Sequence, residues 1–157
     1  MIQVDHDLIG RQHEQAAQEM LRVCRPGGKI GLVNWTPDGF IGHVFRTIGK
    51  YMPPPPGVKP PALWGTEQRL NELFGDGIAK LTVNRRMFVF RYRSAEHWLD
   101  VFRTYYGPVL KAFAALDTAG QAGLAHDLTE VLLRFNQGGT DTLAVPSEYL
   151  EVVATRR

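Results

Sequence analysis

Apolar and small residues recur at helical spacing over the first clear segment of the chain, residues 12–24. Ala16 and Met20 fall on one face of a helix, whereas charged side chains fall on the opposite face. Pro26 cannot continue a helix, and the Gly27-Gly28 pair that follows it can adopt positive φ. The pattern therefore predicts an amphipathic helix that ends in a Pro-Gly-Gly turn.

The next segment, residues 29–35, is apolar at consecutive positions. Ile30, Leu32 and Val33 show no alternation with polar residues, which is typical of a strand covered on both faces in a parallel sheet. Such a strand normally has neighbours on both of its edges. The pattern raises the question of where the rest of its sheet is encoded.

Two later segments predict further strands, so that we expect an α/β fold with about three strands in a mixed sheet. Residues 78–92 alternate, with Phe88 and Phe90 on one face, and residues 143–155 form the last strand. Thr36 and Thr118 are expected helix caps. The expected helices cover residues 37–51, 66–74, 94–106 and 109–116, and a last one runs from 118 to the glycines at 138 and 139.

Composition limits the classes of protein that fit this pattern. A chain of 157 residues with 44% hydrophobic content predicts one domain, residues 1–157, around one core. The net charge of +2 provides no long-range field for nucleic acid or an anionic membrane. Cys24 is the only cysteine, which fits a reducing compartment, and no window approaches the length of a membrane span. We expect a cytoplasmic protein without a membrane or nucleic-acid partner.

The stretch "LRVCRPGGKIGLVNW", residues 21–35, resembles class I S-adenosylmethionine-dependent methyltransferases. In that family a leucine-rich helix ends in a Lys/Arg-Pro-Gly-Gly turn and leads into the fifth strand of a Rossmann-like sheet. The continuation to Gly75 resembles the small-molecule branch related to ubiquinone and menaquinone biosynthesis, and the resemblance covers most of the chain from Gln12 onward. It implies a small-molecule methyltransferase with S-adenosylmethionine as cofactor.

The resemblance begins halfway through the family's domain. The family binds its cofactor with a glycine-rich loop after the first strand and an acidic residue after the second. This sequence has no such loop after a strand, and Asp5 and Asp7 precede the first clear helix. The chain is therefore expected to be a C-terminal half whose partial sheet lacks its N-terminal part. Whether it is an enzyme by itself stays open, and we expect weak cofactor binding or none.

The resemblance also implies a strand order and a partner. In the family the last strand lies beside the fifth, which implies the local order 29–35, 143–155, 78–92. The first of these strands then keeps one open edge, and an apolar edge is a template for pairing with another chain. We expect a homodimer, or an exchange of elements between chains, through the strand 29–35.

Asn34 and Trp35 are candidate substrate-binding residues because they end the strand 29–35. Open α/β sheets bind ligands at this end of their strands, and in the resembled family it faces the methyl acceptor. Residues 36–75 would then form a lid or insertion region. The alternative is that Trp35 packs under the following helix and Asn34 caps a turn.

Three residues of this lid region are further candidates for binding a small-molecule acceptor. Phe40, His43 and Trp64 offer aromatic walls for an apolar acceptor, and His43 is the nearest candidate general base because it titrates near neutrality. The alternative for the aromatic residues is that they pack in the core at helical spacing. The alternative for His43 is that it is an ordinary surface histidine. Methyl transfer depends mainly on alignment, so no catalytic residue is assigned.

The sequence gives weaker signals for two other kinds of site. The five histidines lack the paired spacing of metal ligands, so no metal site is predicted. The segment "NRRMFVFRYR" interleaves basic and aromatic residues as RNA-binding sheets do, but the glycines of that motif are missing. The second functional hypothesis is a noncatalytic module that binds an apolar ligand or a partner through the aromatic lid region.

Overall fold

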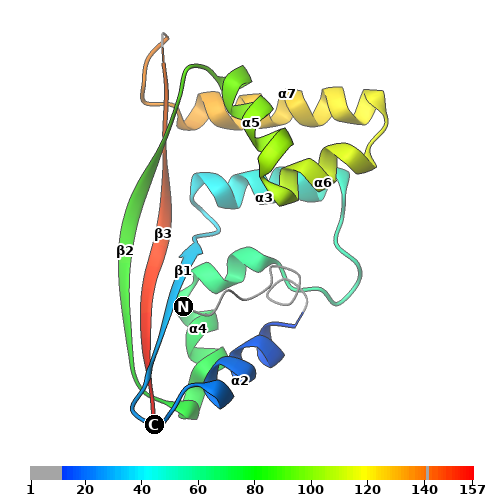
Figure 1. Ribbon diagram of the computed structural model, residues 1–157. Coiled ribbons are helices and arrows are strands. Elements are labelled where there is room, and N and C mark those ends of the chain that lie inside the picture. The colour runs from blue at the N-terminus through cyan, green and yellow to red at the C-terminus, as the bar shows by residue number, and fades with distance from the viewer. Residues whose placement is uncertain (1–11, 141) are drawn as a thin grey trace. The chain divides into compact units, whose positions relative to one another are not determined.

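Figure 1 shows a computed structural model of the chain, which describes residues 12–140 and 142–157. Asp5 and Asp7 lie outside the described residues. The described part contains six α-helices, two short 3-10 helices and three strands. In chain order these are α2 (His13–Val23), β1 (Lys29–Trp35), α3 (Phe40–Tyr51), η1 (Pro61–Gly65), α4 (Glu67–Phe74), η2 (Gly75–Gly77), β2 (Ile78–Tyr92), α5 (Ala95–Tyr105), α6 (Gly107–Ala115), α7 (Thr118–Phe135) and β3 (Leu143–Arg156).

The three strands form one open sheet in the order β1-β3-β2 (Figure 1). This is the local order that the resemblance implies, and that prediction is confirmed. The predicted mixed sheet is wrong, because β3 lies between the other two strands and the sheet is antiparallel. The register pairs Lys29 with Thr155 and Trp35 with Tyr149. Within the described residues, β1 is an edge strand.

The chain divides into two compact units, each built from separate stretches of sequence. The first unit contains the described residues up to Pro37, together with Pro55–Arg86 and Glu148–Arg157. The second contains Asp38–Pro54 and Met87–Ser147. The prediction of a single domain stays a prediction. The expected lid region 36–75 does not form one piece, because α3 belongs to the second unit and α4 to the first.

The first unit has its core between the sheet and the helices α2 and α4. Residues at alternate positions of β1 and β3 face these helices, since successive strand residues point to opposite faces. On α4, Leu70 and Phe74 are buried, so this helix is part of the core. The core cluster comprises Ala16, Ala17, Met20, Ile30, Trp64, Leu70, Phe74, Ile78, Leu150, Val152 and Ala154.

A polar cluster joins α2 to α4 in the first unit, with His13 and Arg69 buried and its carboxylates half exposed. The Arg69 guanidinium donates to Glu14 at 2.6 Å and to Glu72 at 3.0 Å, and Lys59 also pairs with Glu14. The Nε–H of Arg69 points at Nδ1 of His13, 3.4 Å away. His13 is 1% exposed, and its Nε2 has no hydrogen-bond partner within the described residues. Burial and the Arg69 charge lower the pKa of His13.

The second unit packs α3, α5, α6 and α7 around an aromatic core. Phe40 is fully buried, and its ring centroid lies 5.7 Å from Phe90, 5.6 Å from Trp98 and 5.9 Å from Phe135. Trp98 in turn stacks on Phe102 at 3.8 Å. Aromatic pairs with these separations stabilise a core beyond the area they bury. The helices of this unit are thus joined through side chains from four separate elements.

The predicted start of α3 at residue 37 is too early. Thr36 does not cap α3: the helix begins at Phe40 after Gly39, and Thr36 instead donates to the carbonyl of Glu148. The Oγ of Ser147 accepts from the amide of Ile41 at 3.2 Å, which satisfies one N–H of the first turn. A residue distant in sequence has replaced the local cap.

The cap of α7 is Asp117, one residue before the predicted Thr118. Its Oδ1 accepts from the amide of Gly120 at 2.8 Å. The side chain of Gln121 does not close the predicted capping box and donates instead to the carbonyls of Phe113 and Leu116. Aspartate and threonine are both good caps, so the sequence alone did not separate the two registers.

Candidate functional site

Asn34 lies at the end of β1, on the strand face that also carries Ile30 and Leu32. The register places it opposite Leu150. Its side-chain Nδ2 is buried and has no hydrogen-bond partner within the described residues. A buried donor without a partner is costly and unusual in native structures. Among the described residues, the side-chain N–H of Asn34 is therefore left without a partner at the end of this strand.

Trp35 carries its side chain on the opposite face of β1. Its ring meets Tyr149 edge to face, with centroids 5.8 Å apart. Its carbonyl oxygen lies so close to η1 that a Cβ added to Gly65 would be 2.0 Å away from it. Asn34 and Trp35 are both candidates because they end β1, but adjacent strand residues point to opposite faces, so their side chains lie apart. A role in acceptor binding stays a prediction for each.

The structure places two of the predicted acceptor contacts in packed cores. Trp64 is 2% exposed in the first unit, where its ring lies 5.5 Å from His13 and 6.2 Å from Phe74. Phe40 is fully buried in the second unit. Both residues pack in a core, which is the alternative that the sequence analysis gives for them. A role in acceptor binding stays a prediction for each.

His43 lies on α3 with its ring half-buried against Phe135, at a centroid distance of 5.1 Å. Its Nδ1 lies 2.9 Å from the Arg134 guanidinium, which can only donate. Burial and the charges of Arg46 and Arg134 lower the pKa of His43, so the ring is neutral at neutral pH. With Nδ1 accepting, the proton sits on Nε2, and the ring presents an N–H donor. This geometry is unsuited to a general base.

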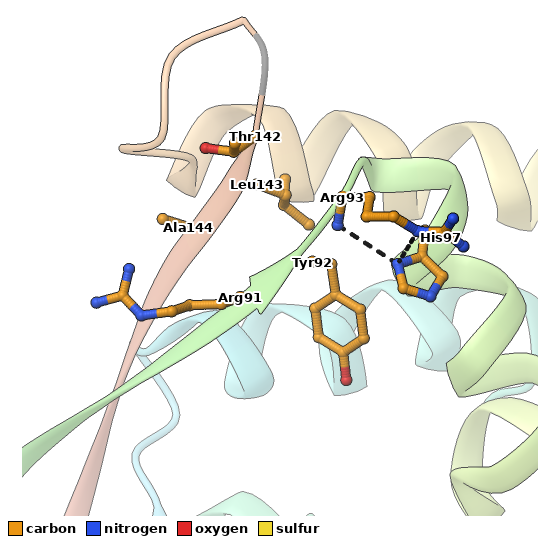
Figure 2. Close-up of a pocket in the computed structure, with 7 residues that line it drawn as sticks. All are labelled: Arg91, Tyr92, Arg93, His97, Thr142, Leu143 and Ala144. Atoms are coloured by element: carbon orange, nitrogen blue, oxygen red, sulfur yellow. Dashed lines mark hydrogen bonds between the residues drawn. The ribbon is translucent and has the colours of Figure 1, made fainter.

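A pocket in the second unit lies where the end of β2 faces the beginning of β3. Its volume is about 420 Å³. Figure 2 shows Arg91 and Arg93 extending toward opposite ends of the lining, with Tyr92 between them. The lining residues are Arg91, Tyr92, Arg93, His97, Thr142, Leu143 and Ala144. None of the five predicted site residues lines this pocket.

Asn136 positions the wall of the pocket that β3 provides through four hydrogen bonds. Its Oδ1 accepts from the amides of Gly138 and Ala144 at 2.8 and 2.9 Å, and its Nδ2 donates to the carbonyls of Gly139 and Thr142. Thr142 also donates from its hydroxyl to the carbonyl of Gly138. These contacts fix Thr142 and Ala144 relative to the end of α7.

A second, smaller pocket of about 240 Å³ lies between α3 and α7. It is lined mainly by charged groups, with Lys50 3.5 Å from Asp127 across it. Arg134, the partner of His43, lies on its wall. Its cations and carboxylates already neutralise one another, so the pocket provides little net charge for a ligand.

Sequence reasoning missed the residues of the larger pocket. The basic and aromatic alternation that ends in Arg91, Tyr92 and Arg93 was interpreted as a strand with solvated arginines, with RNA binding as the alternative. The capped start of α5, where Ser94 accepts from the amide of His97, was a further signal that the chain turns there. What the sequence lacked was the pairing of this turn with Thr142–Ala144, which is a tertiary contact.

Three features are absent from the described residues. No group of three or more His, Cys, Asp or Glu side chains there is placed to hold a metal ion. Within the same residues, no helix has both the length and the apolar character needed to cross a bilayer. The glycines with positive φ, Gly27, Gly57, Gly75 and Gly139, do not form a glycine-rich loop after a strand.

Comparison with known proteins finds mycobacterial relatives. Over 152 residues, 96% of this chain, it is 37% identical to "Uncharacterized protein Rv1405c" of Mycobacterium tuberculosis and to "Uncharacterized protein Mb1440c" of Mycobacterium bovis, covering 55% of each. It is 35% identical over 128 residues to "Uncharacterized protein Rv1403c" of Mycobacterium tuberculosis, which covers 79% of this chain and 47% of that protein. No family model matches the chain. The chain thus spans about half the length of the curated relatives it matches.

Proposed function

We propose that this chain is the C-terminal half of a small-molecule methyltransferase that uses S-adenosylmethionine. The observation that carries the proposal is the strand order β1-β3-β2, with the last strand of the chain antiparallel between the other two. This is the order that the resemblance of residues 21–35 implies for the end of that family's sheet. The mycobacterial relatives, which are nearly twice as long as the matched stretch, support the same interpretation.

The described residues of this chain do not fit the cofactor by themselves. The glycine-rich loop that would let backbone amides approach the cofactor is absent from them. We therefore assign the cofactor site to the part of the longer relatives that this chain does not match. The sulfonium of the cofactor is already a strong electrophile, so the protein's contribution is mainly alignment and exclusion of water.

On this proposal Asn34 and His43 are the acceptor-binding candidates that have a hydrogen-bond donor available. The Nδ2 of Asn34 is a buried donor with no partner in the described residues. The Nε2–H of His43 is the second donor, because Arg134 occupies Nδ1. Asn34 belongs to the first unit and His43 to the second, so each is a separate candidate for orienting an acceptor through an oxygen atom, and neither would remove a proton from it.

Calorimetric titration with S-adenosylmethionine and its demethylated product tests the proposal. We expect micromolar binding of both compounds to the full-length relative from Mycobacterium tuberculosis and no binding to this chain at the same concentrations. Absence of binding to the full-length relative would refute the methyltransferase assignment. It would favour the second hypothesis, a noncatalytic binding module.

We further propose that the isolated chain forms a homodimer through the open edge of β1 at residues 29–33, because η1 lies against the carbonyl of Trp35 at the end of the same edge. The amide of Thr36 and the carbonyl of Gly28 bond to β3 residues, and groups alternate along an antiparallel strand. The N–H and C=O groups of Gly31 and Val33 therefore point away from β3, toward the open edge. Val33 is also 70% exposed. Unpaired backbone groups beside an exposed apolar side chain favour pairing with a second copy.

Light scattering over a concentration series tests this pairing. Val33→Pro removes the N–H group that faces the open edge, a change that edge strands tolerate. We expect the unchanged chain to dimerise at micromolar concentrations, Val33→Pro to be monomeric, and the control Val33→Thr, which keeps the N–H group, to dimerise. A monomeric unchanged chain, or a dimer that survives Val33→Pro, would contradict the proposal.

A further inference from the structure

The pocket between the end of β2 and the beginning of β3 has the size of a small-molecule site. Its volume of about 420 Å³ lies within the range of roughly 300–1,000 Å³ that is common for such sites. Among the described residues, its lining contains two arginines and a histidine and no carboxylate. All seven lining residues belong to the second unit.

The two arginines of the pocket differ from those earlier on the same strand. Arg85 pairs with Glu148 at 2.9 Å, and Arg86 lies 3.5 Å from Glu151. Arg91 and Arg93 have no carboxylate within 4.0 Å among the described residues. A guanidinium without an anionic partner is available to bind an oxyanion, and its planar fork suits carboxylate and phosphate groups.

His97 adds a hydrogen-bond donor beside Arg93. Its Nδ1 accepts from the backbone amide and from Nε of Arg93, each at 3.4 Å (Figure 2). In the neutral ring the proton is then on Nε2, which is left to donate. The same contacts hold Arg93 at the start of α5, so less side-chain entropy is lost when its guanidinium binds a ligand.

The floor of the pocket is apolar. Leu143 and Ala144 come from β3, and the Tyr92 ring comes from β2, where it meets His97 edge to face at 5.4 Å. Asn136 fixes the β3 side of this floor through its bonds to Thr142 and Ala144. An apolar floor with cationic groups at its ends suits a molecule that has an apolar body and an anionic group.

We propose that this pocket binds a small organic anion through a carboxylate or phosphate group. The oxyanion bonds to the guanidinium of Arg93, which lies with the Tyr92 ring beside His97, and the apolar body lies against Leu143 and that ring. Arg91 contributes its charge from the opposite face of β2. The site is independent of cofactor binding and of the methyltransferase proposal. It uses residues 91–97 and 142–144, which the acceptor candidates do not include.

Titration followed by NMR tests the site with three aromatic probes: benzoate, phenyl phosphate and the neutral amide benzamide. We expect benzoate or phenyl phosphate to bind about tenfold or more tightly than benzamide, because hydrogen bonds to charged groups are the stronger ones. The amide signals of the lining residues should shift. Whichever anion binds more tightly identifies the preferred group. Binding of all three probes with equal affinity, or of none at millimolar concentration, would overturn the proposal.

Arginine variants locate the anion. Arg91→Gln and Arg93→Gln are made as single variants and as a double variant. The control is Arg25→Gln, which removes one positive charge from an exposed turn of the first unit. We expect the double variant to lose about tenfold or more in affinity for the anion and Arg25→Gln to lose none. The affinities of the two single variants show which of the two guanidinium groups binds the anion. Unchanged affinity in a folded double variant, verified by its NMR spectrum, would overturn the site.

Discussion

Gly65 occupies a position where even one methyl group does not fit. A Cβ there would lie 2.0 Å from the carbonyl oxygen of Trp35 and 2.6 Å from its carbonyl carbon. We expect Gly65→Ala to lower the free energy of unfolding by about 1–3 kcal/mol, because the backbone of β1 or η1 must move. Denaturant unfolding measures the change.

The matched control is Gly31→Ala in the same unit. A Cβ at Gly31 meets no atom within 4 Å, so the free energy of unfolding should be unchanged or up to about 1 kcal/mol higher. Equal destabilisation by the two substitutions would mean that η1 and β1 are not in close contact.

His13 should make the stability of the first unit depend on pH. Its pKa is lowered by burial and by Arg69 in the folded state, so below about pH 6.5 the unfolded chain binds more protons. Stability is therefore fully present above that pH and falls as the pH decreases. Pairing with Arg69 and Lys59 lowers the pKa of Glu14 to about 2, so this carboxylate stays ionised throughout.

Unfolding measured at about pH 8 and about pH 5 checks this dependence. His13→Gln should reduce the loss of stability on acidification, whereas His126→Gln on the exposed side of α7 should leave it unchanged. The lowered pKa of His43 acts in the same direction, so part of the dependence should persist in His13→Gln. A full, unaltered dependence in that variant would contradict the role of His13.

At the scale of elements, α3 depends on a residue from β3. Ser147 is fully buried and its hydroxyl accepts from the amide of Ile41. We expect Ser147→Ala to lower the free energy of unfolding by about 1–3 kcal/mol, because a buried N–H group loses its partner. Thr118→Ala, at an exposed position in the first turn of α7, should cost less than about 0.5 kcal/mol. Equal costs would show that Ser147 does not act as the cap of α3.

Local patterns predicted the elements themselves well. The helix 12–24 and the strands 29–35, 78–92 and 143–155 agree with α2, β1, β2 and β3 to within one residue at each end. Thr66 and Ser94 cap α4 and α5 as local signals indicate. The error at Thr36 arose because its hydroxyl and the first turn of α3 bond to residues more than 100 positions away, which a local pattern does not contain.

At the scale of the whole molecule, the sequence did not predict two compact units. Each is assembled from separate stretches, and β2 and β3 contribute to both. This is why the candidate site was only partly predictable. Asn34 was found because it ends a recognisable strand, whereas Trp64 looked like a pocket wall and lies in a core with His13 and Phe74. The pocket at Arg91–Arg93 needs the contact with Thr142–Ala144, which only the tertiary structure provides.

The central claim is that β1 belongs to a larger sheet in the longer relatives. The alternation of backbone groups makes the amides of Gly31 and Val33 the ones that face the open edge, while those of Ile30 and Leu32 bond to β3. Amide hydrogen exchange tests the claim most directly, measured in this chain at concentrations below those at which it dimerises and at the matching positions of the full-length Mycobacterium tuberculosis relative. We predict rapid exchange at Gly31 and Val33 here and slow exchange at both matching positions in the relative. Rapid exchange in both proteins would contradict the account.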